Sequence, residues 1–261
     1  KLRKLTFLSL TYNHLTGSIP GSIGELTSLT LLSPSYNHLT GTIPSEINKL
    51  SKLTHFSLDN NMLNGTIPLK DGNYPYLQSL TLDNNRLTGT IPETIYSFTN
   101  LGNLELQGNF LTGTISKRIS NLTNLVALDL GSNMLNGSIP SFIGDNSKLV
   151  SLKLDKNGFT GVLPDTLGSL TSLEIFTVHD NSLSGTIPTS VAQAPSHLAR
   201  YSGNNFNGSL DFICDQKPNY IAADCHGDNP EVLCSCCDEC CSDDGCFGPS
   251  GCEFTADFLC T

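Results

Sequence analysis

Carboxylate side chains stand at matching positions in successive segments of this chain, and they are the first candidates for binding chemistry. Asp59 and Asp83 lie 24 residues apart, and Glu105 and Asp129 repeat that interval at a second position. If neighbouring segments pair as strands, such carboxylates repel one another and offer a docking spot for a cation or a basic ligand. The alternative is a well-hydrated acidic face on which water and salt absorb the repulsion. The sequence alone favours the hydrated face and leaves both open.

Tyrosines, lysines and a histidine extend the candidates to both sides of these carboxylates. Tyrosine is an efficient contact residue at interfaces. The first two segments are near-duplicates, however, so copying of a segment explains the tyrosine pair equally well. The positions divide into a hydroxyl and tyrosine zone, an acidic zone and a zone of mixed charge. The ligand-binding candidates are Tyr12, Tyr36, Asp59, Asp83, Glu105, Asp129, Lys153, Asp155, Lys156, His179 and Asp180.

Catalysis is not expected from this set. His179 and Asp180, beside Thr177, suggest an acid–base relay. Adjacent residues on a strand point in different directions, so we expect a solvated surface pair instead. The chain contains no nucleophile elbow, zinc-binding His-Glu-x-x-His, phosphate loop or kinase signature. The sequence therefore predicts a protein that is not an enzyme, with no cofactor and no metal.

Ten cysteines form the second chemical feature. An even number packed this densely predicts a disulfide-stapled module from an oxidising compartment; a local Cys214–Cys225 bridge is plausible, and the other pairings cannot be deduced. Zinc is the alternative, since Cys-x-x-Cys spacing suits a tetrahedral site, but adjacent cysteines chelate one ion poorly. Residues 224–231 have loose calcium-loop character without the required pattern. The predicted disulfide cysteines are Cys214, Cys225, Cys234, Cys236, Cys237, Cys240, Cys241, Cys246, Cys252 and Cys260.

The distribution of charge changes close to the point where the cysteines begin, at Cys214. Residues 1–209 carry 13 acidic and 13 basic side chains, whereas residues 210–261 carry 11 acidic side chains and only Lys217. A neutral body with an acidic end offers no basic face for nucleic acid or for an anionic membrane surface. The sequence contains neither a signal peptide nor an apolar run that could span a bilayer.

An asparagine that returns every 24 residues shows which elements position these side chains. In one repeat, Leu128 and Leu130 alternate as in a short strand, and stacked repeats place such strands side by side as a parallel sheet, about 4.8 Å apart. A second extended piece and a short convex helix or 3₁₀ turn follow. The period predicts a solenoid that opens within a repeat, so we expect a portion of a longer product. The asparagines are Asn13, Asn37, Asn61, Asn85, Asn109, Asn133, Asn157 and Asn181, with Asn204 one residue early.

The recurrent residues are expected to have structural roles. The asparagine amide should satisfy backbone groups of the turn that leaves the strand and of the next coil. The glycine four residues later, such as Gly137, should lie at positive φ or at a close backbone approach. Three departures mark irregular coils: Pro34 removes a ladder donor, Asp71 stands in an apolar slot of a looser convex loop, and Ser116 replaces a recurrent proline.

The phrase Leu-x-x-Leu-x-Leu-x-x-Asn-x-Leu-x-Gly-x-Ile-Pro-x-x-Ile-Gly resembles the plant-type leucine-rich repeat of receptor-like kinases, receptor-like proteins and polygalacturonase inhibitors. The resemblance covers residues 1–209 in nine repeats of about 24 residues. It implies an α/β solenoid, a horseshoe or superhelix with a parallel sheet on its concave face and short 3₁₀ or helical convex segments. The run Cys234-Ser-Cys236-Cys237-Asp-Glu-Cys240-Cys241 is similar to the cysteine-rich ends of leucine-rich-repeat receptor-like proteins of diatoms. Residues 210–261 are therefore expected to form an acidic, disulfide-rich C-terminal module.

The resemblance implies an extracellular recognition module that binds a protein, peptide or glycan on its concave face. The alternatives are a secreted inhibitor of a wall-degrading hydrolase and a structural matrix protein cross-linked through its cysteines. The uncapped N-terminal edge is expected to meet preceding repeats or a co-receptor. Sequons support a secretory route and predict glycans along one flank and the convex back. These sequons begin at Asn64, Asn121, Asn136 and Asn207.

Overall fold

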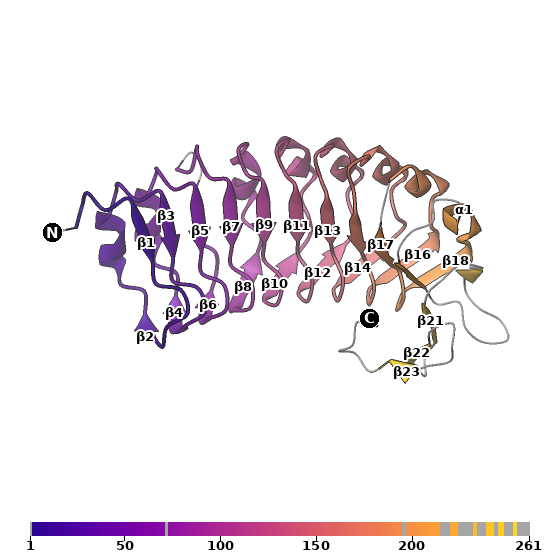
Figure 1. Cartoon of the computed structure of the whole chain (residues 1–261), viewed down its shortest axis with the longest axis horizontal. Coiled ribbons are helices and arrows are strands. Elements are labelled where there is room, and N and C mark those ends of the chain that lie inside the picture. The colour runs from indigo at the N-terminus through magenta and orange to yellow at the C-terminus, as the bar shows by residue number, and fades with distance from the viewer. Residues whose placement is uncertain are drawn as a thin grey trace.

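The chain winds into stacked coils, each of which contributes a strand to two separate sheets (Figure 1). A computed structural model describes residues 2–70, 73–194, 197–214 and 220–223, together with the short strands 232–233, 239–242, 245–247 and 253–254. The coils follow one another along the long axis, with the N-terminus at one end of the stack. The predicted α/β solenoid with parallel sheets is confirmed.

The first sheet contains the strands that the Leu-x-Leu alternation predicts. Neighbouring strands pair in parallel and in repeat register, so that Leu80, for example, lies opposite Leu104. In order, its strands are β1 (Phe7–Ser9), β3 (Leu31–Ser33), β5 (His55–Ser57), β7 (Ser79–Thr81), β9 (Asn103–Glu105), β11 (Ala127–Asp129), β13 (Ser151–Lys153), β15 (Ile175–Thr177), β17 (Leu198–Arg200), β19 (Tyr220–Ala223), β21 (Glu239–Ser242), β22 (Gly245–Phe247) and β23 (Glu253–Phe254). Only the last two pairings are antiparallel among the described strands.

The second sheet forms from the extended piece around the recurrent glycine. Gly113, with φ of +83°, lies so close to the preceding coil that a Cβ atom would stand 2.9 Å from Cγ2 of Thr90. The positive φ expected of this glycine is thereby confirmed, and the group close to it belongs to a side chain and not to the backbone. The strands are β2 (Thr16–Ser18), β4 (His38–Thr42), β6 (Met62–Gly65), β8 (Arg86–Thr90), β10 (Phe110–Gly113), β12 (Met134–Gly137), β14 (Gly158–Gly161), β16 (Ser182–Thr186), β18 (Asn205–Ser209) and β20 (Val232–Leu233).

The convex segments are 3₁₀ helices, and the apolar core lies between them and the two sheets. Leu128 and Leu130 turn inward and are at most 1 % exposed. Burial of such a side chain contributes about 1.5–3 kcal/mol, which makes the coil-to-coil contact the main source of stability. The helices are η1 (Gly21–Glu25), η2 (Ser45–Lys49), η3 (Glu93–Ser97), η4 (Lys117–Asn121), η5 (Ser141–Asp145), η6 (Asp165–Ser169) and η7 (Thr189–Gln193), followed by the α-helix α1 (Asp211–Cys214).

The recurrent asparagine bonds to the turn as predicted, but to the preceding coil and not to the next one. Oδ1 of Asn37 accepts the backbone N–H of Leu15 at 2.9 Å, and Nδ2 donates to the carbonyl of Leu10 at 2.9 Å. The same Nδ2 donates to the carbonyls of Pro34 and Ser35, both at 3.0 Å. The predicted direction was wrong because the amide lies on the side of its coil that faces the N-terminus.

The predicted irregularities have local consequences. Pro34 follows β3, where the equivalent Leu58 donates its N–H to the next coil at 2.8 Å. Ser116 caps η4, and its hydroxyl oxygen accepts the N–H of Arg118. Between β6 and β7 the described residues form no 3₁₀ helix, and Asp71 lies outside them.

The side chains of all ten cysteines lie outside the described residues. The disulfide module, its boundary at residue 210 and its likeness to diatom proteins therefore remain predictions. The 224–231 segment also lies outside the described residues.

Candidate ligand-binding face

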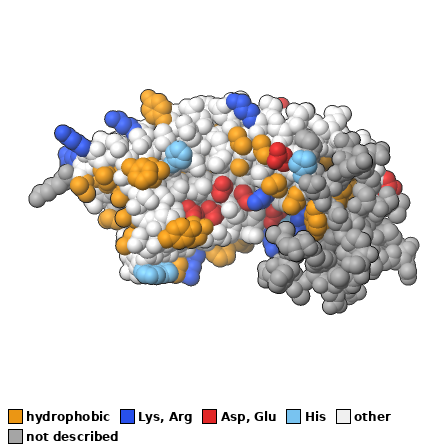
Figure 2. Space-filling view, in the orientation of Figure 1, with side chains coloured by type: hydrophobic (Ala, Val, Ile, Leu, Met, Phe, Trp, Pro, Cys, Tyr) orange, Lys and Arg blue, Asp and Glu red, His pale blue; other side chains and the backbone are white. Residues whose placement is uncertain are grey.

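The first sheet presents its outward side chains, and those of the turn behind each strand, on one face that we call the first-sheet face. Figure 2 shows acidic side chains gathered near the middle of this face. Asp59 and Asp83 follow β5 and β7, whose residues Ser57 and Thr81 lie opposite each other, so the two carboxylates occupy neighbouring coils. Their positions follow from the repeat register.

These two carboxylates are buried, so the expected well-hydrated acidic face is wrong at this point. Asp59 is 9 % exposed and Asp83 is 7 % exposed. The Ser35 hydroxyl donates to Asp59, and Asn60 Nδ2 donates to its other oxygen at 3.1 Å. Asn84 Nδ2 donates to Asp83 at 2.8 Å. Among the described residues, no lysine, arginine or histidine nitrogen lies within 4.0 Å of either carboxylate.

Burial without a cation changes the chemistry of Asp83. Burial, followed by the charge of Asp59, raises the pKa of Asp83 to about 6. The carboxylate of Glu105 adds a smaller contribution in the same direction. A ligand that brings a positive charge to this place would supply the missing partner.

The two further acidic candidates, Glu105 and Asp129, end β9 and β11 and extend the row of carboxylates toward β13. Burial is the largest cause that raises the pKa of Glu105 and also of Asp129. Lys153 lies beyond them, with Nζ 3.4 Å from Oδ2 of Asp129. The acidic zone, Asp59, Asp83, Glu105 and Asp129, is thus neutralised at only one end by the described basic residues.

His179 and Asp180 touch, contrary to the expectation that their side chains point in different directions. His179 Nδ1 lies 2.9 Å from Oδ2 of Asp180, and Nε2 lies 3.5 Å from Oδ2 of Asp155. Asp180 has a left-handed φ of +54°, which breaks the alternation of a strand and turns its side chain toward the imidazole. His179 is also buried, at 7 % exposure, and is not a solvated surface residue.

The contacts around this histidine continue as a linear series of side chains from Thr177 to Asp180. The Thr177 hydroxyl donates to Asp155 at 2.5 Å. The hydrogen bond from His179 is the largest cause that lowers the pKa of Asp180. Lys156 is exposed beside them. We call Lys153, Asp155, Lys156, His179 and Asp180 the mixed zone.

Two stacked aromatic pairs join the first coil to the second, at the N-terminal end of the array. The rings of Tyr12 and Tyr36 stack with centroids 4.3 Å apart, and those of His14 and His38 stack at 5.9 Å. A side-chain hydrogen bond with Tyr12 is the largest cause that raises the pKa of Tyr36. The tyrosine zone, Tyr12 and Tyr36, is exposed enough to contact a partner.

The candidates therefore extend along the whole described array in three zones, and they do not converge on one pocket. Sequence reasoning missed Ser202 and Arg200, which stand two and four residues before Asn204. The other candidates stand one, two or four residues before their own asparagines, so the same rule applied to Asn204 finds both residues. The charge of Arg200 contributes to the lowered pKa of Asp180.

The four sequon asparagines have exposed side chains. Asn64, Asn136 and Asn207 lie on β6, β12 and β18 of the second sheet, and Asn121 ends η4 on the convex side. This placement matches the predicted flank and back. Glycosylation itself remains a prediction.

Within the described residues, no three His, Cys, Asp or Glu side chains are grouped closely enough to hold a metal ion. The helices in the same part of the chain are all too short or too polar to cross a membrane.

Comparison with protein families identifies the repeat. A family model described as leucine-rich repeat matches residues 75–135, and a second of the same description matches residues 4–26 and 148–170. Both describe a repeat and not a catalytic domain. No curated protein matches the chain.

Solved structures with the same fold include plant receptor ectodomains. A TDR receptor is 38 % identical, with a TM-score of 0.79, over 84 % of this chain and 38 % of that one. The plant peptide hormone receptor RGFR1 in complex with RGF2 is 33 % identical, with a TM-score of 0.77, over 84 % and 36 %. The Arabidopsis receptor kinase HAESA, in complex with the peptide hormone IDA and the co-receptor SERK1, is 36 % identical, with a TM-score of 0.75, over 83 % and 37 %.

The chain spans less than two fifths of the length of these three receptors. A plant ice-binding protein, 24 % identical with a TM-score of 0.65 over 87 % of this chain and 83 % of that one, shares the fold alone. The chain therefore carries leucine-rich repeats, and its described coils form a leucine-rich-repeat solenoid similar to those of plant receptor ectodomains.

Proposed function

We propose that this chain is an extracellular recognition module that binds a basic peptide segment across its first-sheet face. The observation that carries the proposal is the pair of buried carboxylates, Asp59 and Asp83, with no described basic nitrogen within 4.0 Å. The similarity to receptor ectodomains solved with peptide hormones supports a peptide as the ligand class.

The energetics favour a ligand that brings a lysine or an arginine to this pair. A buried carboxylate without a cation is costly when it is ionised, so an incoming cation gains more here than at a solvated carboxylate. A peptide that crosses successive strands would place its basic side chain on the acidic zone. It would then meet the mixed zone on one side and the stacked tyrosines on the other.

Binding of a labelled peptide of alternating lysine and glycine residues tests the proposal. The double variant Asp59→Asn plus Asp83→Asn is expected to weaken binding at least tenfold at pH 7.5, whereas Asp165→Asn, an exposed change on η6, leaves it unchanged. The same peptide with acetylated lysines serves as the uncharged control. Equal affinity of the parent protein and the double variant would show that this pair does not carry binding.

The proposed ligand face leaves the second sheet for glycans. We propose that Asn64, Asn136 and Asn207 carry N-linked glycans on that flank, with Asn121 on the convex back. Mass spectrometry of the protein from a eukaryotic secretory host, before and after glycosidase treatment, measures their occupancy. Unmodified asparagines at all four sequons would refute the glycan assignment without bearing on the peptide-binding test.

A further inference from the structure

Two histidines and a methionine occupy the same position in three consecutive coils. His14, His38 and Met62 each follow directly after a recurrent asparagine, at intervals of 24 residues. The second sheet joins these coils, because β2 pairs with β4 and β4 pairs with β6. Neighbouring strands of a sheet stand about 4.7–4.9 Å apart. The three side chains therefore form a row of two imidazoles and one thioether, which we call the His–Met row.

The backbone under this row is held by hydrogen bonds between coils. The N–H of His38 donates to the carbonyl of Leu15 at 2.9 Å. The N–H groups of Leu15 and Leu39, which directly follow the two histidines, each donate to an asparagine of the next coil at 2.9 Å. The imidazole rings stack with centroids 5.9 Å apart and an interplanar angle of 16°. Since a metal–nitrogen bond is about 2.0–2.1 Å long, two rings at this separation can reach one ion by side-chain rotation alone.

Both imidazoles of the row are exposed and available as ligands. Among the described residues, no carboxylate oxygen lies within 4.0 Å of either ring, and the side-chain hydrogen bonds of histidine belong to His55 and His179. The two nitrogens of His179 lie 2.9 and 3.5 Å from aspartate oxygens. His55 lies opposite Leu31 and Ser79 in the first sheet, and neither residue is a soft donor. The stacked pair is thus better placed to bind a metal ion than either of these histidines.

The donor set decides which metal the row suits. Imidazole nitrogen binds zinc, copper and nickel, whereas a thioether sulfur is a soft ligand that selects copper(I). Met62 is half-buried beside His38. Within the described residues, the two histidines are not part of a group of three His, Cys, Asp or Glu, so the third donor of the row is the sulfur. Hard cations prefer oxygen ligands, which the row does not supply.

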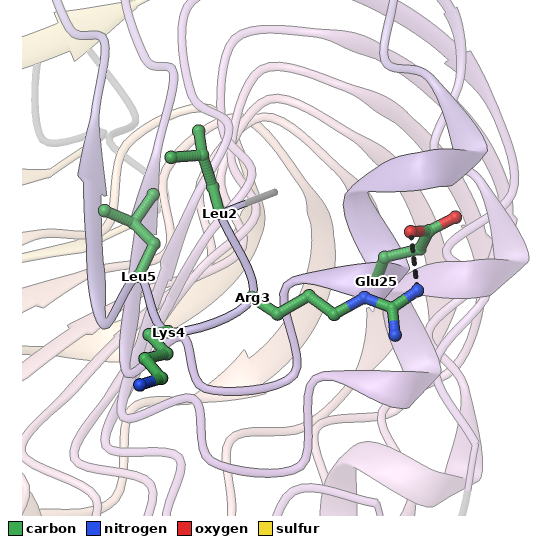
Figure 3. A pocket seen from close by; sticks show the side chains of 5 residues that line it. All are labelled: Leu2, Arg3, Lys4, Leu5 and Glu25. Carbon is green, nitrogen blue, oxygen red and sulfur yellow. Dashed lines mark hydrogen bonds and ion pairs between the residues drawn. The ribbon is translucent and has the colours of Figure 1, made fainter.

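The hollow at the N-terminal end of the array does not offer a comparable site. It is lined by Leu2, Arg3, Lys4, Leu5 and Glu25 (Figure 3). Its one carboxylate, that of Glu25, already lies 3.2 Å from Nη2 of Arg3, and Lys4 adds a second positive charge. A cation that entered this hollow would be repelled by more charge than attracted it.

We propose that His14, His38 and Met62 bind one copper(I) ion, through two imidazole nitrogens and one thioether sulfur. The row lies outside the first-sheet face, so the proposal does not depend on the peptide ligand. The repeat also provides an internal comparison. Met134 is exposed at the same position of the sixth coil, but its neighbour in the preceding coil is Phe110, which has no donor atom.

Methionine-methyl NMR tests the proposal, because the chain contains only two methionines. The whole chain is labelled with carbon-13 at its methionine methyl groups, any free thiols are alkylated, and copper(I) is added with ascorbate under nitrogen. One equivalent should shift the methyl signal of Met62 and leave that of Met134 in place. Met134→Leu assigns the two signals and should leave copper(I) binding unchanged. If the Met62 signal does not shift, the proposal is wrong.

The affinity for copper(I), measured by competition with a chromophoric chelator, tests each ligand. Met62→Leu should weaken binding about tenfold or more, because leucine has no donor atom. The double variant His14→Gln plus His38→Gln should abolish the shift of the Met62 signal, whereas His55→Gln, at an exposed histidine outside the row, should leave it unchanged. Equal affinity of Met62→Leu and the parent, or an undiminished Met62 shift in the double variant, would also overturn the proposal.

Discussion

Replacement of Asp83 by asparagine is expected to stabilise the protein at neutral pH. The folded-state pKa of about 6 stands above the ordinary value of 3.8, so the folded protein holds a proton between these pH values that the unfolded chain has lost. The free energy of unfolding therefore falls as pH rises through this window. The introduced amide keeps the size of the side chain and an oxygen that can accept from Asn84, but it carries no charge to desolvate.

The magnitude follows from the shift in pKa. Two pKa units correspond to at most about 3 kcal/mol. The face is open to water on one side, so we discount this for screening to about 1–2 kcal/mol at pH 7.5. In a domain of this size that gain raises the melting temperature by about 2–8 °C. At pH 4, where the carboxyl of the folded protein is protonated, the variant and the parent should have nearly equal stability.

Urea unfolding at pH 4, 5, 6 and 7.5 measures this difference. Asp165→Asn is the matched control, since Asp165 is exposed on the convex side. The quantity of interest is the stability of Asp83→Asn minus that of the parent, because Glu105 and Asp129 add a pH dependence of their own. A variant that is less stable than the parent at pH 7.5, or a difference that does not grow with pH, would refute the electrostatic argument.

Two structural predictions follow from the repeat. Asn109→Ala should cost about 1–3 kcal/mol in urea unfolding, since it leaves the buried N–H of Leu87 without its acceptor and removes one of the two donors to each of three carbonyls, those of Leu82, Leu106 and Gln107; a loss below 0.5 kcal/mol, an order-of-magnitude threshold for a surface substitution, would contradict this. Gly113→Ala and Gly17→Ala should each cost about 1–2 kcal/mol because of their positive φ. The cost at Gly113 should be the larger, because only there does a new Cβ meet the methyl group of Thr90; Thr90→Ser should reduce that excess, and equal costs at the two glycines would rule out the contact.

The periodic parts of the fold could be predicted from the sequence, and the side-chain environments could not. Leu128 and Leu130 indicate a strand because their alternation depends on local geometry. The left-handed conformation of Asp180 is not encoded in an alternation of apolar residues, so its contact with His179 was missed. Burial of Asp59 depends on neighbours in other coils, and a sequence column shows which residues are adjacent but not how deep they lie.

The N-terminal direction of the asparagine bonds has a consequence for how such arrays change in evolution. Loss of coils from the C-terminal side leaves every remaining asparagine with its partner, whereas loss from the N-terminal side always strands one. An internal duplication of 24 residues keeps the phase and brings its own asparagine, so each junction closes again. Arrays of this kind can therefore lengthen anywhere in phase. Shortening strands an asparagine at the N-terminal side, whereas at the C-terminal side it strands backbone N–H groups, such as that of Leu183, which donates to Asn204.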